Sequence, residues 1–131
     1  MKNILFICKY NRFRSKTAEA IFNKINKDKT ISVKSAGLIK GSPISKEIFE
    51  AVSEAGYKIK GKPEGISTDL LKWQDTMIIV ADDIPKSLFK ENIKYGKKLI
   101  VWNIPDSKTD TKEEIRKITK QIEKKVKELI K

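Results

Sequence analysis

Three continuous apolar runs, and a fourth segment in which apolar and polar residues alternate, constrain the fold of this chain more than any other feature. Short apolar runs of this kind are typical of strands buried in a sheet. The four segments are residues 3–8, 31–35, 76–81 and 98–102. Because strands that alternate with helices join in parallel through right-handed crossovers, we expect a four-stranded parallel sheet with helices on both faces.

The segments between these strands have helical periodicity. Helices are expected from Ser15 to about Ile25, over residues 45–55, in a short stretch after Pro85, and from Thr111 to the end of the chain. Gly56 is expected to stop the second helix, and Thr111 with Glu114 has capping-box spacing. The residues from 58 to 67 are expected to form a loop. The sequence therefore predicts one domain over residues 1–131, with three layers in α/β/α order.

The residue counts exclude several classes of enzyme. The 131 residues include no histidine and a single cysteine, Cys8. A Ser-His-Asp triad, a Cys-His dyad and a histidine-ligated metal site therefore cannot be built. An internal disulfide and a cysteine-rich zinc site are also impossible. We expect neither a metal nor another cofactor.

The charge is strongly basic, with 29 Lys and Arg against 17 Asp and Glu, a net charge of +12. A solvated lysine-rich surface explains this better than a nucleic-acid site, because aromatic residues do not interleave with the basic runs. The first apolar run is too short for a signal peptide or a membrane span. We therefore expect a cytoplasmic monomer that binds neither nucleic acid nor membrane.

The segment from Cys8 to Ser15 lies between the first predicted strand and the first predicted helix. A tight loop there points backbone N–H groups inward, and the helix N-terminus adds positive potential, so an oxyanion is favoured. The guanidinium of Arg14 can hold two phosphate oxygens, and the same field favours the thiolate of Cys8. The predicted phosphate-binding residues beside Cys8 are Lys9, Tyr10, Asn11, Arg12, Phe13, Arg14 and Ser15.

A general acid is also needed, because an alkoxide or phenoxide is a poor leaving group, and without histidine a carboxylate is the candidate. Asp106 follows the last predicted strand, at the sheet edge that carries Cys8, and we predict that it is the acid. Asp110 is a rival, although its position favours a cap of the final helix. Asp82 and Asp83 also end a strand at that edge. A competing interpretation makes Cys8 a small core residue.

The order of these segments resembles that of a known family, the low-molecular-weight protein tyrosine phosphatases, over the whole chain. The family motif is a cysteine, two residues, an asparagine, two residues, an arginine and a serine. It is matched by Cys8, Asn11, Arg14 and Ser15. Ala-Glu-Ala at 18–20, Ser-Ala-Gly at 35–37 and Ile-Pro-Asp at 104–106 also resemble family segments, in the same order. The resemblance implies a flavodoxin-like fold.

The resemblance also implies a catalytic role for three residues. Cys8 is the nucleophile, which forms a thiophosphate intermediate. Arg14 and the loop amides bind the phosphate and stabilise the transition state. Asp106 protonates the leaving oxygen and then activates the water that hydrolyses the intermediate.

Three more residues are implied to support the loop. Ser15 donates a hydrogen bond to the thiolate, while Asn11 and Ser35 hold the shape of the loop, since asparagine tolerates the left-handed conformation. The alternative for Ser15 is a simple helix N-cap, and the two roles can coexist.

The chain departs from the family at several positions. Tyr10 stands where glycine is common, and Phe13 stands where some members have a second, protective cysteine. Residues 61–67 lack the supporting histidine, and Ser107 replaces the proline that commonly follows the acid. Tyr10 either supplies a ring beside the pocket or packs on the surface.

The expected function is hydrolysis of a phosphomonoester, on a phosphorylated protein or a small phosphate ester, with protein phosphotyrosine as the favoured substrate. One alternative is a phosphate-binding regulatory module with little activity. The other is a thiol-dependent arsenate reductase, which relays oxidation through further cysteines, whereas this chain has only Cys8.

Overall fold

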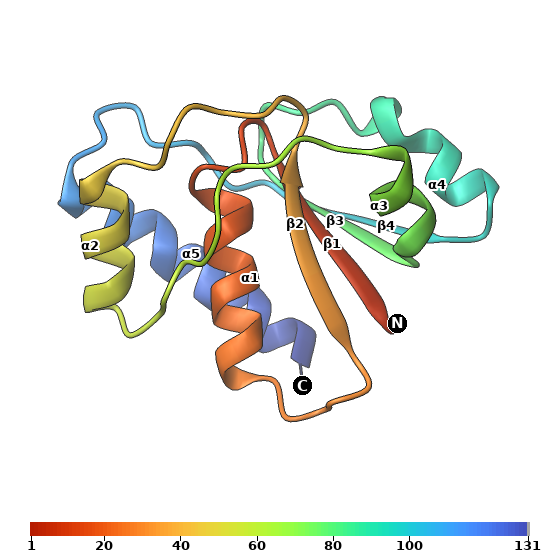
Figure 1. Cartoon of the computed structure of the whole chain (residues 1–131), viewed down its shortest axis with the longest axis horizontal. Coiled ribbons are helices and arrows are strands. Elements are labelled where there is room, and N and C mark those ends of the chain that lie inside the picture. Colours follow the sequence, from red (N-terminus) through yellow and green to blue (C-terminus); the bar gives the residue numbers. More distant parts are fainter. Residues whose placement is uncertain (131) are drawn as a thin grey trace.

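The computed structural model describes residues 1–130 and contains one parallel four-stranded sheet in the order β2-β1-β3-β4 (Figure 1). The strands are β1 (Asn3–Cys8), β2 (Ser32–Gly37), β3 (Thr76–Val80) and β4 (Lys98–Trp102). The connection from β1 leads to β2 on one side, whereas β3 and β4 are added on the other side of β1. A topological switch point therefore lies between β1 and β3. Ligands of open α/β sheets bind at the carboxyl ends of the strands beside such a point.

Helices cover both faces of the sheet. They are α1 (Arg14–Ile25), α2 (Lys46–Glu54), α3 (Thr68–Trp73), the short 3-10 helix η1 (Lys86–Phe89), α4 (Lys90–Lys94) and α5 (Lys112–Ile130). Figure 1 shows α1, α2 and α5 on one side of the sheet, and α3 and α4 on the other. The predicted three-layer, flavodoxin-like α/β/α architecture is confirmed.

The central strand β1 supplies side chains to both apolar layers. Ile4 and Phe6 pack with residues of α1, α2 and α5, whereas Leu5 and Ile7 pack towards α3. All four side chains are fully buried. Because each buried side chain of this size contributes roughly 1.5–3 kcal/mol, β1 is fixed rigidly, and so is the loop that follows Cys8.

Several boundaries differ from the predictions. The sequence analysis assigned no structure to residues 68–73, which form α3, capped by Ser67, whose hydroxyl accepts a hydrogen bond from the Leu70 amide. Strand β2 starts one residue later than predicted and continues to Gly37, and β3 ends at Val80. The stop at Gly56 is confirmed by its positive φ of 98°. Helix α5 reaches Ile130, and Lys131 lies outside the described residues.

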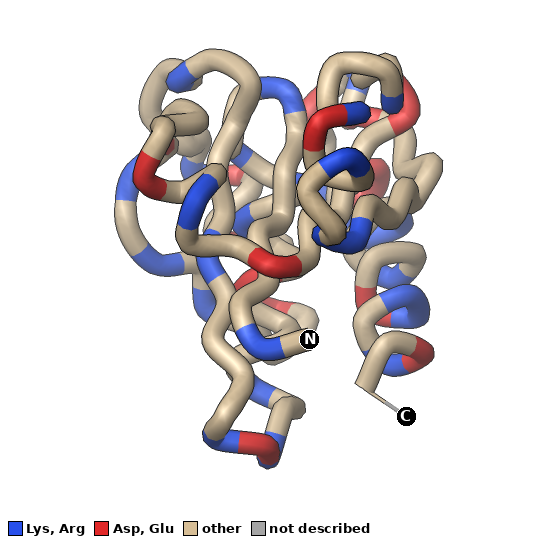
Figure 2. Tube along the Cα trace, turned by 90° about the vertical axis from the view of Figure 1, so that its right-hand side faces the viewer, with Lys and Arg blue, Asp and Glu red and all other residues tan. Residues whose placement is uncertain are grey.

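The basic residues are spread along the fold rather than confined to one stretch. Figure 2 shows Lys and Arg positions on most parts of the trace, with fewer acidic positions between them. Within residues 1–130, no helix combines the length and apolar character that crossing a membrane requires.

Candidate active site

Cys8 ends β1 and is almost fully buried, with 2% of its surface exposed. Its Sγ lies 2.9 Å from the Ser15 hydroxyl, and the Asn11 amide donates to the sulfur at 3.3 Å. The thiol also lines a small pocket of about 120 Å³. The geometry therefore differs from that of a cysteine that only fills the core.

Asn11 holds the loop in its turn. Its backbone is left-handed, with a φ of 55°, and its side chain is fully buried. The side-chain amide donates to Ser15 Oγ at 2.8 Å and to Ser35 Oγ at 3.0 Å. Its carbonyl oxygen accepts from the Glu64 amide at 2.9 Å. The Asn11 amide takes one lone pair of the Ser15 oxygen and leaves the Ser15 proton free for the contact with Cys8, in which either atom can be the donor.

The network ends on a carboxylate that the sequence analysis did not assign to the site. The Ser35 hydroxyl donates to Glu19 Oε1 at 2.7 Å. Burial raises the pKa of Glu19, and the hydrogen bond from Ser35 offsets part of that rise. The only indication in the sequence that Glu19 belongs to the site was its place at 18–20, in a segment that resembles the family.

Gly37 lets the end of β2 pass close to this loop. A Cβ at Gly37 would lie 2.7 Å from the backbone nitrogen of Asn11 and 2.7 Å from the carbonyl carbon of Tyr10. Any side chain there would push the loop away from the sheet, so the close approach requires glycine.

Arg14 lies in the first turn of α1 with 1% of its surface exposed. Its Nη1 donates to the Ile104 carbonyl at 3.0 Å and lies 3.1 Å from Asp83 Oδ1. Asp82 Oδ1 is 4.0 Å from the same nitrogen. The Nε edge faces Asp106 Oδ1 at 3.7 Å. Asp82 and Asp83, which the sequence offered as rival acids, therefore lie beside Arg14 and fix its guanidinium.

The pocket above Cys8 joins the loop to the segment after β4, as predicted. It is lined by Cys8, Tyr10, Arg12, Phe13, Arg14, Ile48, Asp106, Ser107 and Asp110. The sequence analysis did not assign Ile48 to the site, because it comes from α2, and spacing gave no indication that it reaches the loop.

Two helix caps differ from those considered in the sequence, and some predicted phosphate-binding residues lie outside the pocket lining. Asp110 does not cap α5, because the Glu114 amide donates to Thr111 Oγ at 3.3 Å; Asp110 instead lines the pocket with a φ of 53°. Ser15 is not an N-cap, because α1 begins at Arg14, one residue earlier, and the Ser15 hydroxyl contacts Cys8. The Lys9 ammonium lies 5.4 Å from the Tyr10 ring centroid, and the pocket lining does not include Lys9, Asn11 or Ser15.

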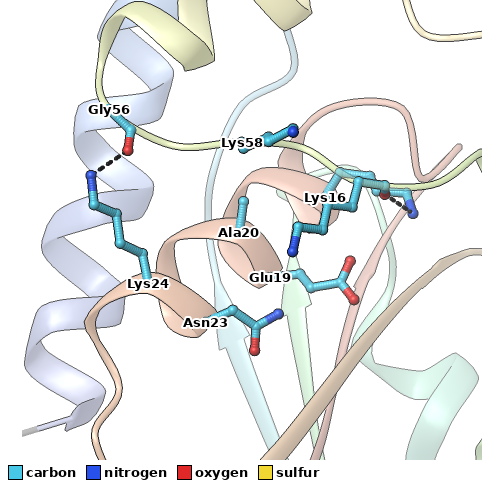
Figure 3. A pocket seen from close by; sticks show the side chains of 8 residues that line it. Lys16, Glu19, Ala20, Asn23, Lys24, Gly56 and Lys58 are labelled. Carbon is cyan, nitrogen blue, oxygen red and sulfur yellow. Dashed lines mark hydrogen bonds between the residues drawn. The ribbon is translucent and has the colours of Figure 1, made fainter.

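A larger pocket of about 350 Å³ adjoins the outer end of the supporting network (Figure 3). It is lined by Glu19, Asn23 and Lys24 of α1 and by the segment that carries Gly56 and Lys58, towards which Lys24 points. The Lys24 ammonium donates to the Gly56 carbonyl at 2.5 Å. This pocket contains neither a thiol nor a second carboxylate, so its size does not make it the reactive site. Within residues 1–130, no group of three or more Cys, Asp or Glu side chains could hold a metal ion.

The flavodoxin-like sheet, with a thiol, an arginine and a carboxylate around one pocket, defines the class of cysteine phosphatase-type α/β proteins. The sequence model of the low molecular weight phosphotyrosine protein phosphatases matches residues 3–131. The chain therefore belongs to that family, as the motif predicted.

Solved structures of similar fold include three that differ in activity. The low molecular weight protein tyrosine phosphatase of T. tengcongensis is 26% identical, with a TM-score of 0.85 over 99% of this chain and 98% of that chain. An arsenate reductase from Archaeoglobus fulgidus is also 26% identical, with a TM-score of 0.75 over 97% and 98% of the two chains. The YwlE arginine phosphatase of Geobacillus stearothermophilus shares the fold at 21% identity, with a TM-score of 0.82 over 99% and 91%.

Proposed function

We propose that this protein is a cysteine-dependent phosphatase that hydrolyses phosphomonoesters through a thiophosphate intermediate. The observation that carries the proposal is the pocket in which Cys8 Sγ, held by donors at 2.9 and 3.3 Å, faces the same space as Arg14 and Asp106.

The first step forms the thiophosphate. The Cys8 thiolate attacks phosphorus, and the bond between phosphorus and the leaving oxygen breaks as the new P–S bond forms. Asp106, in its protonated form, gives its proton to that oxygen, so an alcohol or phenol leaves instead of an oxyanion. The loop amides and the Nε edge of Arg14 stabilise the equatorial oxygens, where the transition-state charge gathers.

The second step returns the enzyme to its starting state. The Asp106 carboxylate, now ionised, accepts a proton from a water molecule that attacks phosphorus. The P–S bond breaks, inorganic phosphate forms, and the thiolate of Cys8 is regenerated. The Ser15 hydroxyl, which lies 2.9 Å from the sulfur, stabilises the thiolate as a leaving group.

The walls of the pocket support an aryl substrate, for which protein phosphotyrosine is our proposal. Tyr10, which is 38% exposed, offers a ring on which a phenyl group can pack, and the apolar Ile48 lies buried in the pocket wall. Arg12 also lines the pocket, and its guanidinium is fixed by the carbonyls of Ser42 at 3.1 Å and Pro43 at 3.2 Å. A fixed positive charge disfavours the cationic leaving group of phosphoarginine.

Two other functions fit the fold less well. An arsenate reductase of the relay type needs further cysteines, and this chain has only Cys8. A regulatory phosphate-binding module would need the loop but would not need Asp106 beside Arg14 at 3.7 Å.

Turnover of para-nitrophenyl phosphate by the wild type and by Cys8→Ser tests the proposal. We expect hydrolysis by the wild type and none by the variant, because serine is not ionised by the loop. Tight phosphate binding by the wild type without turnover would instead establish the binding module.

A further inference from the structure

We infer that Glu114 is a positioning residue for Asp106, because its carboxylate ties the loop that carries Asp106 to the first turn of α5. The inference rests on the proposed role of Asp106 as the general acid. In the sequence, Glu114 was assigned only to the start of the final helix.

One oxygen of Glu114 accepts four hydrogen bonds from this loop. The donors are Ser107 Oγ at 2.7 Å, the Lys108 amide at 2.6 Å, the Thr109 amide at 3.0 Å and Thr109 Oγ at 3.3 Å. All of them belong to the residues that directly follow Asp106. Four donors of the loop therefore share a single acceptor oxygen.

Ser107 connects this acceptor to the carboxyl group of Asp106. Its backbone amide donates to Asp106 Oδ1 at 2.9 Å, while its hydroxyl donates to Glu114. The same hydroxyl accepts from the Asp110 amide at 2.9 Å. On the other side of Asp106, the Ile104 carbonyl is held by Arg14 at 3.0 Å. Asp106 thus lies between two anchors, of which Glu114 is one.

A helix cap alone does not explain this geometry. In a capping box, the Glu114 side chain would accept from the amide of Thr111, the residue that caps α5. It reaches instead to Ser107, Lys108 and Thr109, beyond the end of the helix. The hydrogen bonds, first among them that from the Thr109 amide, lower the pKa of Glu114 to about 2. The carboxylate therefore stays ionised at any pH at which the enzyme would be assayed.

The test compares Glu114→Ala with Glu113→Ala, a matched control on the same turn whose side chain is exposed. Alanine removes the oxygen that accepts all four bonds, whereas glutamine would keep an oxygen in that place. We expect kcat/KM for phenyl phosphate, which reports the first step alone, to fall about tenfold in Glu114→Ala, because a displaced catalytic group transfers its proton less efficiently to a poor leaving group. The kcat/KM for para-nitrophenyl phosphate should change less than about twofold, since this good leaving group needs little protonation.

The inhibition constant for inorganic phosphate should stay unchanged, because the phosphate loop is intact. Equal slowing of both substrates, or identical behaviour of the two variants, would overturn the inference.

Amide hydrogen exchange gives a readout without turnover. Lys108 and Thr109 should exchange faster in Glu114→Ala than in the control, because their amides lose their acceptor. Unchanged exchange at both residues would overturn the inference while leaving the proposed function intact. Absence of turnover in the wild type would overturn the proposed function, and with it any role in positioning its acid.

Discussion

The two loops that meet at the pocket, residues 8–15 and residues 104–111, are built in opposite ways. In the first, Asn11 and Ser15 are fully buried and make their hydrogen bonds within the site. In the second, Asp106 has 45% of its side chain exposed, and the loop is held from its two ends. A nucleophile must lie at a fixed distance from phosphorus, whereas an acid must reach leaving groups of different shapes.

The two left-handed residues show the same contrast. Asn11 and Asp110 have φ angles of 55° and 53°. The side chain of Asn11 makes three hydrogen bonds that offset the strain, to Ser15, Ser35 and Glu64. The carboxylate of Asp110 makes none with residues 1–130, and only its backbone amide is held, by Ser107. In the first loop, buried side-chain hydrogen bonds therefore offset the strain of the left-handed residue. In the second loop, no side-chain hydrogen bond of Asp110 within residues 1–130 offsets it.

Arg14→Lys should have the largest effect, because Arg14 belongs to the first loop and touches the second. Lysine cannot make the forked contacts to phosphate oxygens or hold the Ile104 carbonyl at the same time. We expect kcat for para-nitrophenyl phosphate to fall about 10³-fold, the lower end of the range for arginines that stabilise phosphoryl transfer. Steady-state kinetics measure this, and a loss below about tenfold would mean that the loop amides alone bind the transition state.

Asp106→Asn should affect only the chemistry of the second loop. The amide cannot donate a proton as an acid does, so kcat/KM for phenyl phosphate, which reports the first step alone, should fall about 10²-fold, with a much smaller change for para-nitrophenyl phosphate. The thermal midpoint should remain close to that of the wild type, because the side chain is half-exposed. Equal slowing of the two substrates would show that another group is the acid, and Asp110→Asn would then be tested in the same way.

The fold and the first loop could be predicted because their signals are local. Apolar runs predicted the four strands, and the spacing from Cys8 to Ser15 placed the thiol, the asparagine and the arginine within a single turn of chain. The short helix α3 was missed because its six residues have no clear apolar stripe.

The second loop could be predicted only in part. The position of Asp106 after β4 was enough to place it at the pocket, because the ends of parallel strands meet at one edge. The partners of Arg14 and the clamp by Glu114 depend on side chains that reach across turns. Such contacts leave no periodic pattern in the sequence, so Asp83 and Glu114 were assigned to other roles.

Glycine substitutions at the two left-handed positions should give the smallest effects and the most direct comparison of the loops. Asn11→Gly relieves the strain but leaves the Glu64 amide without its acceptor, so the free energy of unfolding should fall by about 2 kcal/mol. Asp110→Gly relieves the same strain and removes no side-chain hydrogen bond, so it should leave stability unchanged or raise it by about 0.5 kcal/mol. Urea denaturation of both variants measures the difference. If the two proteins lost stability equally, the side chain of Asn11 would not be what holds the first loop, and the contrast between a loop supported from within and a loop supported at its ends would be wrong.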